Sequence, residues 1–194
     1  MEQISFKKQD DKIIVTTYYN RKFANKARNL RGQWDSSSKA WIFDESVEEY
    51  VKQALIDIFG VTGEIPYETC SLLIKDFTAW EMRGEVELFG RTVARAFGRD
   101  SGAKLGDDII WVSGSYHSGG SVKNWTTEVE NGTFEIQNFP LERTKFDDVR
   151  KAVEEGWCEI KVNKKKRNRE EIEAEIAALK SKLYELEEEL KNCE

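Results

Sequence analysis

The chain has 194 residues, of which 39% are hydrophobic and 34% charged, with a formal net charge of −6. No apolar stretch approaches the roughly 18 residues that a membrane-spanning helix needs, and the net negative charge argues against a histone-like coat on nucleic acid. The first dozen residues are charged and lack an apolar signal-peptide core, so we expect a soluble cytoplasmic protein.

The beginning of the chain predicts a strand followed by a helix. Residues 12–19 are β-branched or aromatic, which favours a strand. Asn20 can cap a helix that runs from Arg21 to about Leu30 and carries one apolar stripe. Lysines and arginines occupy the other side of that helix, so we expect a basic face directed to solvent.

Residues 32–43 predict a β-hairpin around a polar turn. If Asp35 pairs with Ala40, Trp34 faces Trp41 across the two strands, because side chains alternate between the faces of a sheet. The two tryptophans then share one face of the hairpin.

A second helix is expected to begin at a capping box and to end at a glycine. Ser46 and Glu49 have the spacing of the box, and Gly60 follows the last apolar position of helical spacing. Residues 1–60 are therefore predicted to form a basic, aromatic β-α-β-β-α module.

Residues 61–163 predict a second domain, mainly antiparallel β with one helix. Several runs rich in β formers are separated by glycine-containing turns. The dipeptide Asn131-Gly132 predicts a type I′ hairpin turn. A helix is expected at residues 145–155 and a last strand at 157–162. The predicted fold class is thus α+β, completed by a helical tail.

Two loops rich in glycine and serine, residues 98–108 and 113–124, could hold a phosphate through backbone amides, although neither matches a P-loop and both could be plain turns. The possible ligand contacts in them are Arg99, Lys104, His117 and Lys123.

The sequence offers no recognisable catalytic or metal-binding constellation. His117 is the only histidine, and no pattern assigns it a carboxylate partner. Cys70, Cys158 and Cys193 lack metal-ligand spacing and are expected to be reduced thiols. We therefore expect no catalytic residue, no metal, no cofactor and no enzymatic activity.

Residues 164–194 predict a basic hinge and an oligomerising helix. The run KKKRNR could contact nucleic acid or serve as a solvated hinge. Apolar residues then alternate four and three apart, which favours a parallel coiled coil in a dimer or higher oligomer, although this seam could also dock on the protein's own core or on another protein. The seam residues are Ile172, Ile176, Leu179, Leu183, Leu186 and Leu190.

One stretch resembles a small module found in plasmid, conjugation and phage proteins of DNA metabolism, with the approximate pattern K-x-L-G-x-x-W-D-x-x-x-K-x-W. The matching residues are Lys26, Leu30, Gly32, Trp34, Asp35, Lys39 and Trp41, with Arg31 as an insertion. More loosely, residues 12–60 resemble the HARP domain of DNA-annealing helicases. The resemblance implies a nucleic-acid context and an accessory role, and it implies no reaction.

The basic and aromatic residues of this module are the candidates for nucleic-acid binding, because cations neutralise phosphates and tryptophan can stack a base. They are Arg21, Lys22, Lys26, Arg28, Arg31, Trp34, Lys39 and Trp41. The same pattern also fits two core tryptophans beneath the helices and a merely solvated basic face.

The leading functional hypothesis is a non-enzymatic, oligomeric, nucleic-acid-binding accessory protein of a phage or other mobile element, with DNA or RNA as partner and no membrane. If a phage encodes it, its location is the host cytoplasm. The alternative is an anti-defence protein, for example an anti-CRISPR or nucleotide-sequestering inhibitor, that binds a host defence complex. In that case the acidic middle domain could imitate nucleic acid.

Overall fold

The computed structural model describes residues 4–162, which form one compact unit with two hydrophobic clusters. None of the described helices has the length and apolar character needed to cross a membrane.

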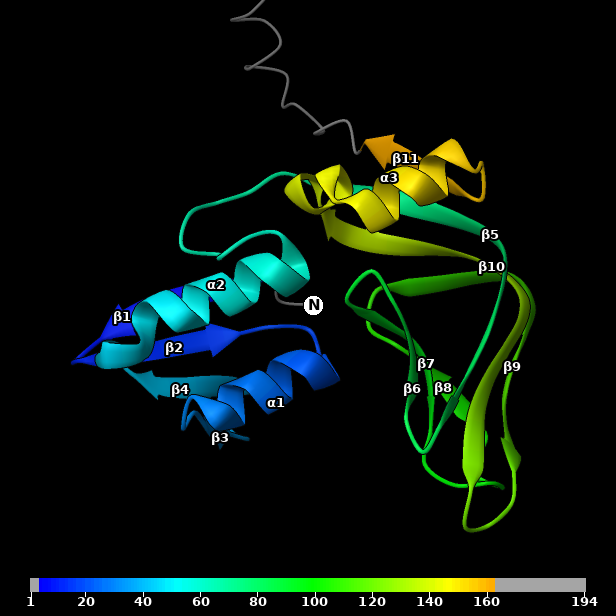
Figure 1. Cartoon of the computed structure of the whole chain (residues 1–194), viewed down its shortest axis with the longest axis horizontal. Helices are drawn as coiled ribbons and strands as arrows, with labels where there is room; N and C mark the ends of the chain where they lie inside the picture. The colour runs from blue at the N-terminus through cyan, green and yellow to red at the C-terminus, as the bar shows by residue number, and fades with distance from the viewer. Residues whose placement is uncertain (1–3, 163–194) are drawn as a thin grey trace, which may run out of the picture. The chain divides into compact units, whose positions relative to one another are not determined.

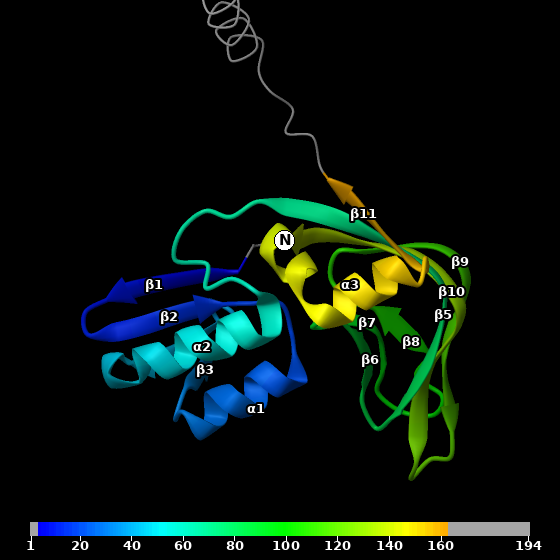
Figure 2. The same cartoon turned by 45° about the horizontal axis from the view of Figure 1, so that its top comes forward.

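The first half is a four-stranded antiparallel sheet, in the order β1-β2-β4-β3, with two helices side by side on one face (Figures 1 and 2). Apolar side chains of β2, α1 and α2, among them Ile13, Phe23 and Leu55, are fully buried between these layers. The elements are β1 (Ser5–Gln9), β2 (Lys12–Thr16), α1 (Arg21–Asn29), β3 (Gln33–Asp35), β4 (Ala40–Asp44), the 3-10 turn η1 (Glu45–Val47) and α2 (Glu48–Phe59).

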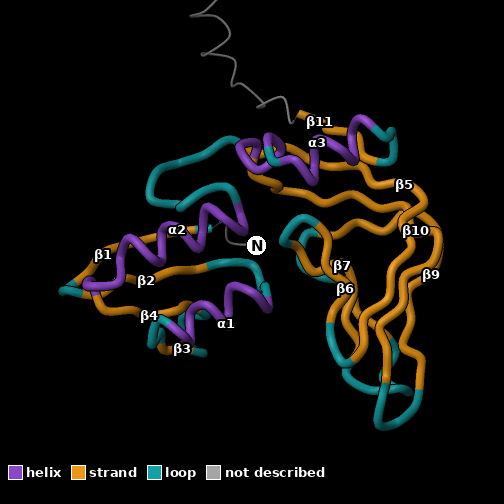
Figure 3. Tube along the Cα trace, in the orientation of Figure 1, coloured by secondary structure: helices purple, strands orange, loops and turns teal. Residues whose placement is uncertain are grey.

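The second half contains a four-stranded sheet, β11-β5-β10-β9, and a three-stranded sheet, β6-β7-β8, and all its strand pairs are antiparallel. Figure 3 shows the long strands β5, β9 and β10 curving through this half. The elements are β5 (Thr69–Met82), β6 (Glu85–Leu88), β7 (Arg91–Ala96), β8 (Ala103–Leu105), β9 (Ile109–Gly120), β10 (Trp125–Pro140), the 3-10 turn η2 (Leu141–Lys145), α3 (Asp147–Glu154) and β11 (Cys158–Val162).

The predicted fold class was wrong. Strands make up 49% of the described residues and helices 23%, so this part of the chain is mainly antiparallel β. The first module is β-β-α-β-β-α, because β1 precedes the strand that the sequence predicts. The charged residues Lys7 and Lys8 make β1 look unlike a strand in the sequence, although Phe6 of this strand is buried in the core. The predicted C-terminal coiled coil and its seam residues lie outside the described residues.

Two turn predictions were also wrong. Asn131 and Gly132 lie inside β10, where the register shifts against both neighbouring strands. The backbone forms a bulge there, with Asn131 at φ 48°, and a Cβ on Gly132 would lie 2.6 Å from the Trp111 ring. Most of the predicted loop 113–124 is strand β9, because its small residues pair along β10.

Two helix starts differ from the sequence prediction. Asp44 caps the turn before α2, because its carboxylate accepts hydrogen bonds from the backbone and hydroxyl of Ser46. The predicted capping box of Ser46 and Glu49 is therefore wrong. The end of that helix at Gly60, in the left-handed conformation, is confirmed. Helix α3 begins at Asp147, since the 3-10 turn η2 occupies the residues before it.

A buried polar network joins the two halves. The Tyr18 hydroxyl of the first half donates to the Asp108 carboxylate at 2.9 Å, and the Arg91 guanidinium carbon lies 3.4 Å from the centroid of the Tyr18 ring. Arg91 also donates to the carbonyl of Asp107 at 2.9 Å and lies 3.6 Å from the carboxylate of Asp108. These contacts position the segment that follows β2 against the loop that follows β8.

Burial makes the stability of this fold sensitive to alkaline pH. It raises the pKa of the Cys70 and Cys158 thiols from 9.0 to about 11, and it raises the pKa of Tyr18 above its ordinary value. Between pH 9 and about pH 11 the thiols of the unfolded chain lose protons that those of the folded chain keep. The free energy of unfolding is therefore expected to fall as pH rises from about 9. Urea midpoints from pH 8 to 10.5 check this, and a constant midpoint would contradict it. A variant with both cysteines changed to alanine should show a shallower fall between pH 9 and 10.

Candidate functional site

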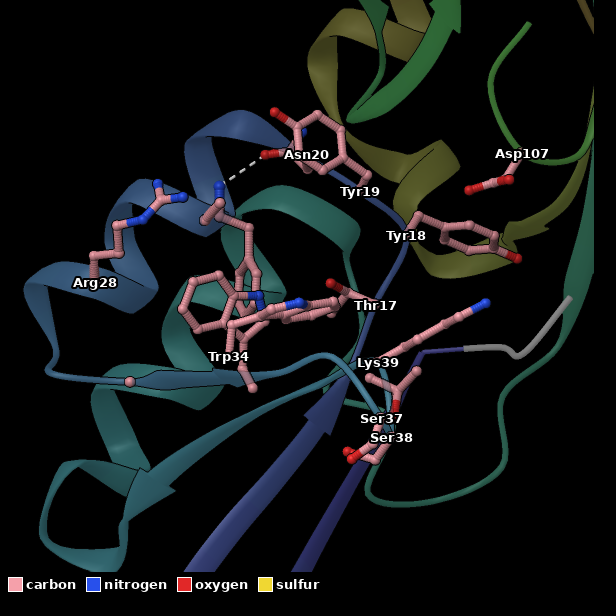
Figure 4. Close-up of a pocket in the computed structure, with 15 residues that line it drawn as sticks. Thr17, Tyr18, Tyr19, Asn20, Arg28, Trp34, Ser37, Ser38, Lys39 and Asp107 are labelled. Atoms are coloured by element: carbon pink, nitrogen blue, oxygen red, sulfur yellow. Dashed lines mark hydrogen bonds between the residues drawn. The ribbon is translucent and has the colours of Figure 1, made fainter.

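A groove with a volume of about 1100 Å³ lies between helix α1, the β3–β4 hairpin and the segment that joins β2 to α1 (Figure 4). Asn20 fixes the entry to α1, because its side-chain oxygen accepts a hydrogen bond from the backbone of Phe23 at 2.8 Å. Its amide donates to the carbonyl of Gly90 in the second half at 3.3 Å. The predicted helix cap is confirmed, and the same residue holds one wall of the groove in place.

The two tryptophans of the hairpin face the groove from different depths. Trp34 pairs with Trp41 across β3 and β4, as the sequence predicts, and their ring centroids lie 5.5 Å apart. Trp41 is only 7% exposed, because it also stacks with Phe43 within the core. Trp34 is 50% exposed, because β3 is the edge strand of its sheet. One ring belongs to the core and the other offers an open aromatic surface.

Two cations border this aromatic surface. Arg28, near the end of α1, lies with its guanidinium carbon 5.8 Å from the centroid of Trp41 and donates to Asn25. Lys39, in the hairpin turn, lines the groove from the opposite side. Within residues 4–162, neither side chain forms an ion pair. Asp107 is the acidic residue in the groove lining, so the cations outnumber it.

Asp35, beside Trp34, serves the hairpin turn. Its carboxylate accepts hydrogen bonds from the hydroxyls and backbone amides of Ser37 and Ser38, with hydroxyl distances of 2.6 Å. These donors hold the pKa of Asp35 well below its usual range. The aspartate thereby fixes the turn that presents Lys39.

The other basic candidates from the sequence do not line the groove. Lys22 lies 3.4 Å from the Glu87 carboxylate, and Lys26 lies 3.3 Å from that of Asp57. Arg21 and Arg31 are exposed away from the groove lining. Of the eight predicted nucleic-acid contacts, the structure therefore brings together Arg28, Trp34, Lys39 and Trp41.

The predicted loop contacts are dispersed. Arg99 pairs with its neighbour Asp100 at 2.9 Å, and Lys123 contributes its backbone carbonyl to Arg83. Lys104 lies on β8 and lines a smaller hollow next to the groove. These residues are therefore not gathered at one ligand site.

His117 lies on β9 between two carboxylates of β10, which no sequence pattern indicated. Its Nδ1 is 3.9 Å from Glu128 and its Nε2 is 3.8 Å from Glu130. The three side chains could offer ligand atoms to a divalent cation. Because all three are partly exposed, and such clusters are common without an ion, this geometry alone indicates no metal site.

Comparison with protein-family models, with curated proteins and with solved structures found no match for this chain. The resemblance of residues 12–60 to the plasmid and phage module and to the HARP domain therefore stays a prediction.

Proposed function

We propose that the groove binds single-stranded nucleic acid, with one base stacked on Trp34 and the flanking phosphates near Arg28 and Lys39. The observation that carries this proposal is the half-exposed ring of Trp34 between two cations that have no acidic partner among the described residues. Stacking of a base on an aromatic side chain contributes about 1–3 kcal/mol and tolerates any base.

A single strand fits this site better than a duplex. Bases in a duplex are stacked on each other and cannot reach a side chain that lies inside a groove, whereas unpaired bases can turn onto an aromatic ring. Asp107 would repel a phosphate, so the phosphates are expected near the cations and a sugar hydroxyl or base amino group near Asp107. This supports a binding role for the site, in keeping with the expected accessory protein without enzymatic activity.

Binding of fluorescent oligonucleotides of roughly 10 nucleotides at several salt concentrations tests the proposal. Trp34→Ala is expected to weaken binding roughly 5- to 150-fold, the equivalent of one lost stack. The variant Arg28→Glu/Lys39→Glu should weaken binding further and flatten the salt dependence, because two phosphate contacts are lost.

Lys7→Glu is the matched control, since Lys7 is exposed on β1, away from the groove, and has no ionic partner in the described part. This control should bind nearly as wild type does. The proposal is wrong if no single strand binds at low salt or if Trp34→Ala has no effect. Equal affinity for a free mononucleotide would favour the alternative of a nucleotide-sequestering protein.

A further inference from the structure

A second hollow, with a volume of about 230 Å³, adjoins the groove on the three-stranded sheet of the second half. Tyr18, Tyr19 and Asp107 line both spaces. Its own side chains include Arg95 of β7, Phe97 just after β7 and Lys104 of β8. The groove and the hollow therefore share a wall and could contact one extended ligand.

The aromatic part of the hollow is exposed in the same way as Trp34. Phe97 is 62% exposed and Tyr19 43% exposed. The guanidinium carbon of Arg95 lies 4.7 Å from the ring centroid of Tyr19 and 5.0 Å from that of Phe97. Arg95 therefore contacts two partly exposed aromatic rings at the surface of the sheet, and an exposed ring can accept a base.

The cationic part of the hollow is unusual for a sheet. Arg95 and Lys104 lie directly opposite each other on β7 and β8, and like charges in such a pair destabilise a sheet. Glu85 of β6 pairs with Arg95 from the other side of β7 and offsets this repulsion only in part. Its carboxylate is 3.9 Å from Arg95 Nε, beyond hydrogen-bond distance. Arg95 Nε is a buried donor with no hydrogen-bond partner within the described residues. An anion between Arg95 and Lys104 would relieve the repulsion.

We propose that this hollow binds a further phosphate of the same single strand between Arg95 and Lys104, with the adjoining base on Phe97. The inference rests on the proposed function of the groove and extends it. The ligand is then an oligonucleotide long enough to reach from Trp34 to Phe97, and shorter ligands occupy the groove alone.

A length series of single-stranded oligonucleotides, from roughly 3 to 12 nucleotides, tests this with the full chain. We expect Phe97→Ala/Lys104→Gln to weaken binding of the longest ligands roughly 5- to 150-fold. It should also reduce the slope of log affinity against log salt by about 0.7, the value of one phosphate contact on a single strand. Binding of the shortest ligands should not change.

The control Tyr50→Ala/Lys7→Gln removes an aromatic ring that is 67% exposed and one lysine, both away from the two sites. It should bind all lengths as wild type does. The inference is overturned if Trp34→Ala weakens binding while Phe97→Ala/Lys104→Gln changes neither affinity nor salt slope at any length, in which case the proposed function stands. It is also overturned if short and long ligands lose affinity equally. Failure of every oligonucleotide to bind wild type removes the proposed function and the extension together.

Discussion

Replacing Arg91 with alanine is expected to lower the free energy of unfolding by about 3–5 kcal/mol, because it removes one member of a buried ion pair and leaves the other unpaired. Arg91 is 2% exposed and donates to the carbonyls of Asp107 and Gln137. Without it, the Asp108 carboxylate keeps, among the described residues, the hydrogen bonds from Tyr18 and Asn138. The substitution should destabilise both halves, because Arg91 belongs to the second half and contacts Tyr18, which belongs to the first hydrophobic cluster.

Urea unfolding of Arg91→Ala beside Arg150→Ala measures this effect. Arg150 is an exposed arginine on α3 without a side-chain partner in the described part, so its removal should change stability by about 0.5 kcal/mol or less. Tyr18→Phe should cost about 1.5–3 kcal/mol, the net contribution of one hydrogen bond to a charged group. If Arg91→Ala and Arg150→Ala unfold at the same urea concentration, the buried network contributes nothing to joining the halves.

Local features of the first module could be predicted from the sequence. The polar turn and the alternating side chains define the register of the β3–β4 hairpin, so the facing of Trp34 and Trp41 is confirmed. Asn20 at the start of α1 and Gly60 after α2 have specific backbone roles, and both are confirmed. In each case the deciding interactions lie within about ten residues of one another along the chain.

The errors occur where distant segments override a local signal. The Asn131-Gly132 turn signal fails because β10 pairs with β5 on one side and β9 on the other, which outweighs a single turn. The basic residues of α1 do not act as one free cationic face, because Lys22 and Lys26 pair with Glu87 and Asp57, which lie far along the chain.

The hollow was missed for the same reason. Arg95 and Phe97 are two residues apart in the chain, but only the fold brings Tyr19 against Arg95. Lys104 was predicted as a loop contact, and its position opposite Arg95 depends on the β7–β8 pairing. A sequence pattern could indicate each cationic or aromatic residue, but not their common surface.

Trp41→Ala and Trp34→Ala are expected to lower the free energy of unfolding by different amounts, although the two residues face each other on one hairpin. Trp41→Ala removes a ring that is 7% exposed and packed against Phe43, so it should lower the free energy of unfolding by about 3–5 kcal/mol. Trp34→Ala removes a half-exposed ring and should cost less, about 1–2 kcal/mol, because only half of its surface is buried.

In the binding assay, Trp34→Ala should have the larger effect, whereas Trp41→Ala has the larger effect on stability. At a temperature where both variants are folded, Trp34→Ala loses the open stacking surface, whereas Trp41→Ala keeps Trp34 in the groove. Trp41→Phe supports this comparison, since it retains an aromatic core residue and should restore most of the stability that Trp41→Ala loses. Equal urea midpoints for the two alanine variants would mean that the hairpin buries the two rings to the same extent. A large stability loss from Trp34→Ala would mean that Trp34 is a core residue and leave the groove without its stacking surface, because a ring needed for folding cannot also lie open to a base.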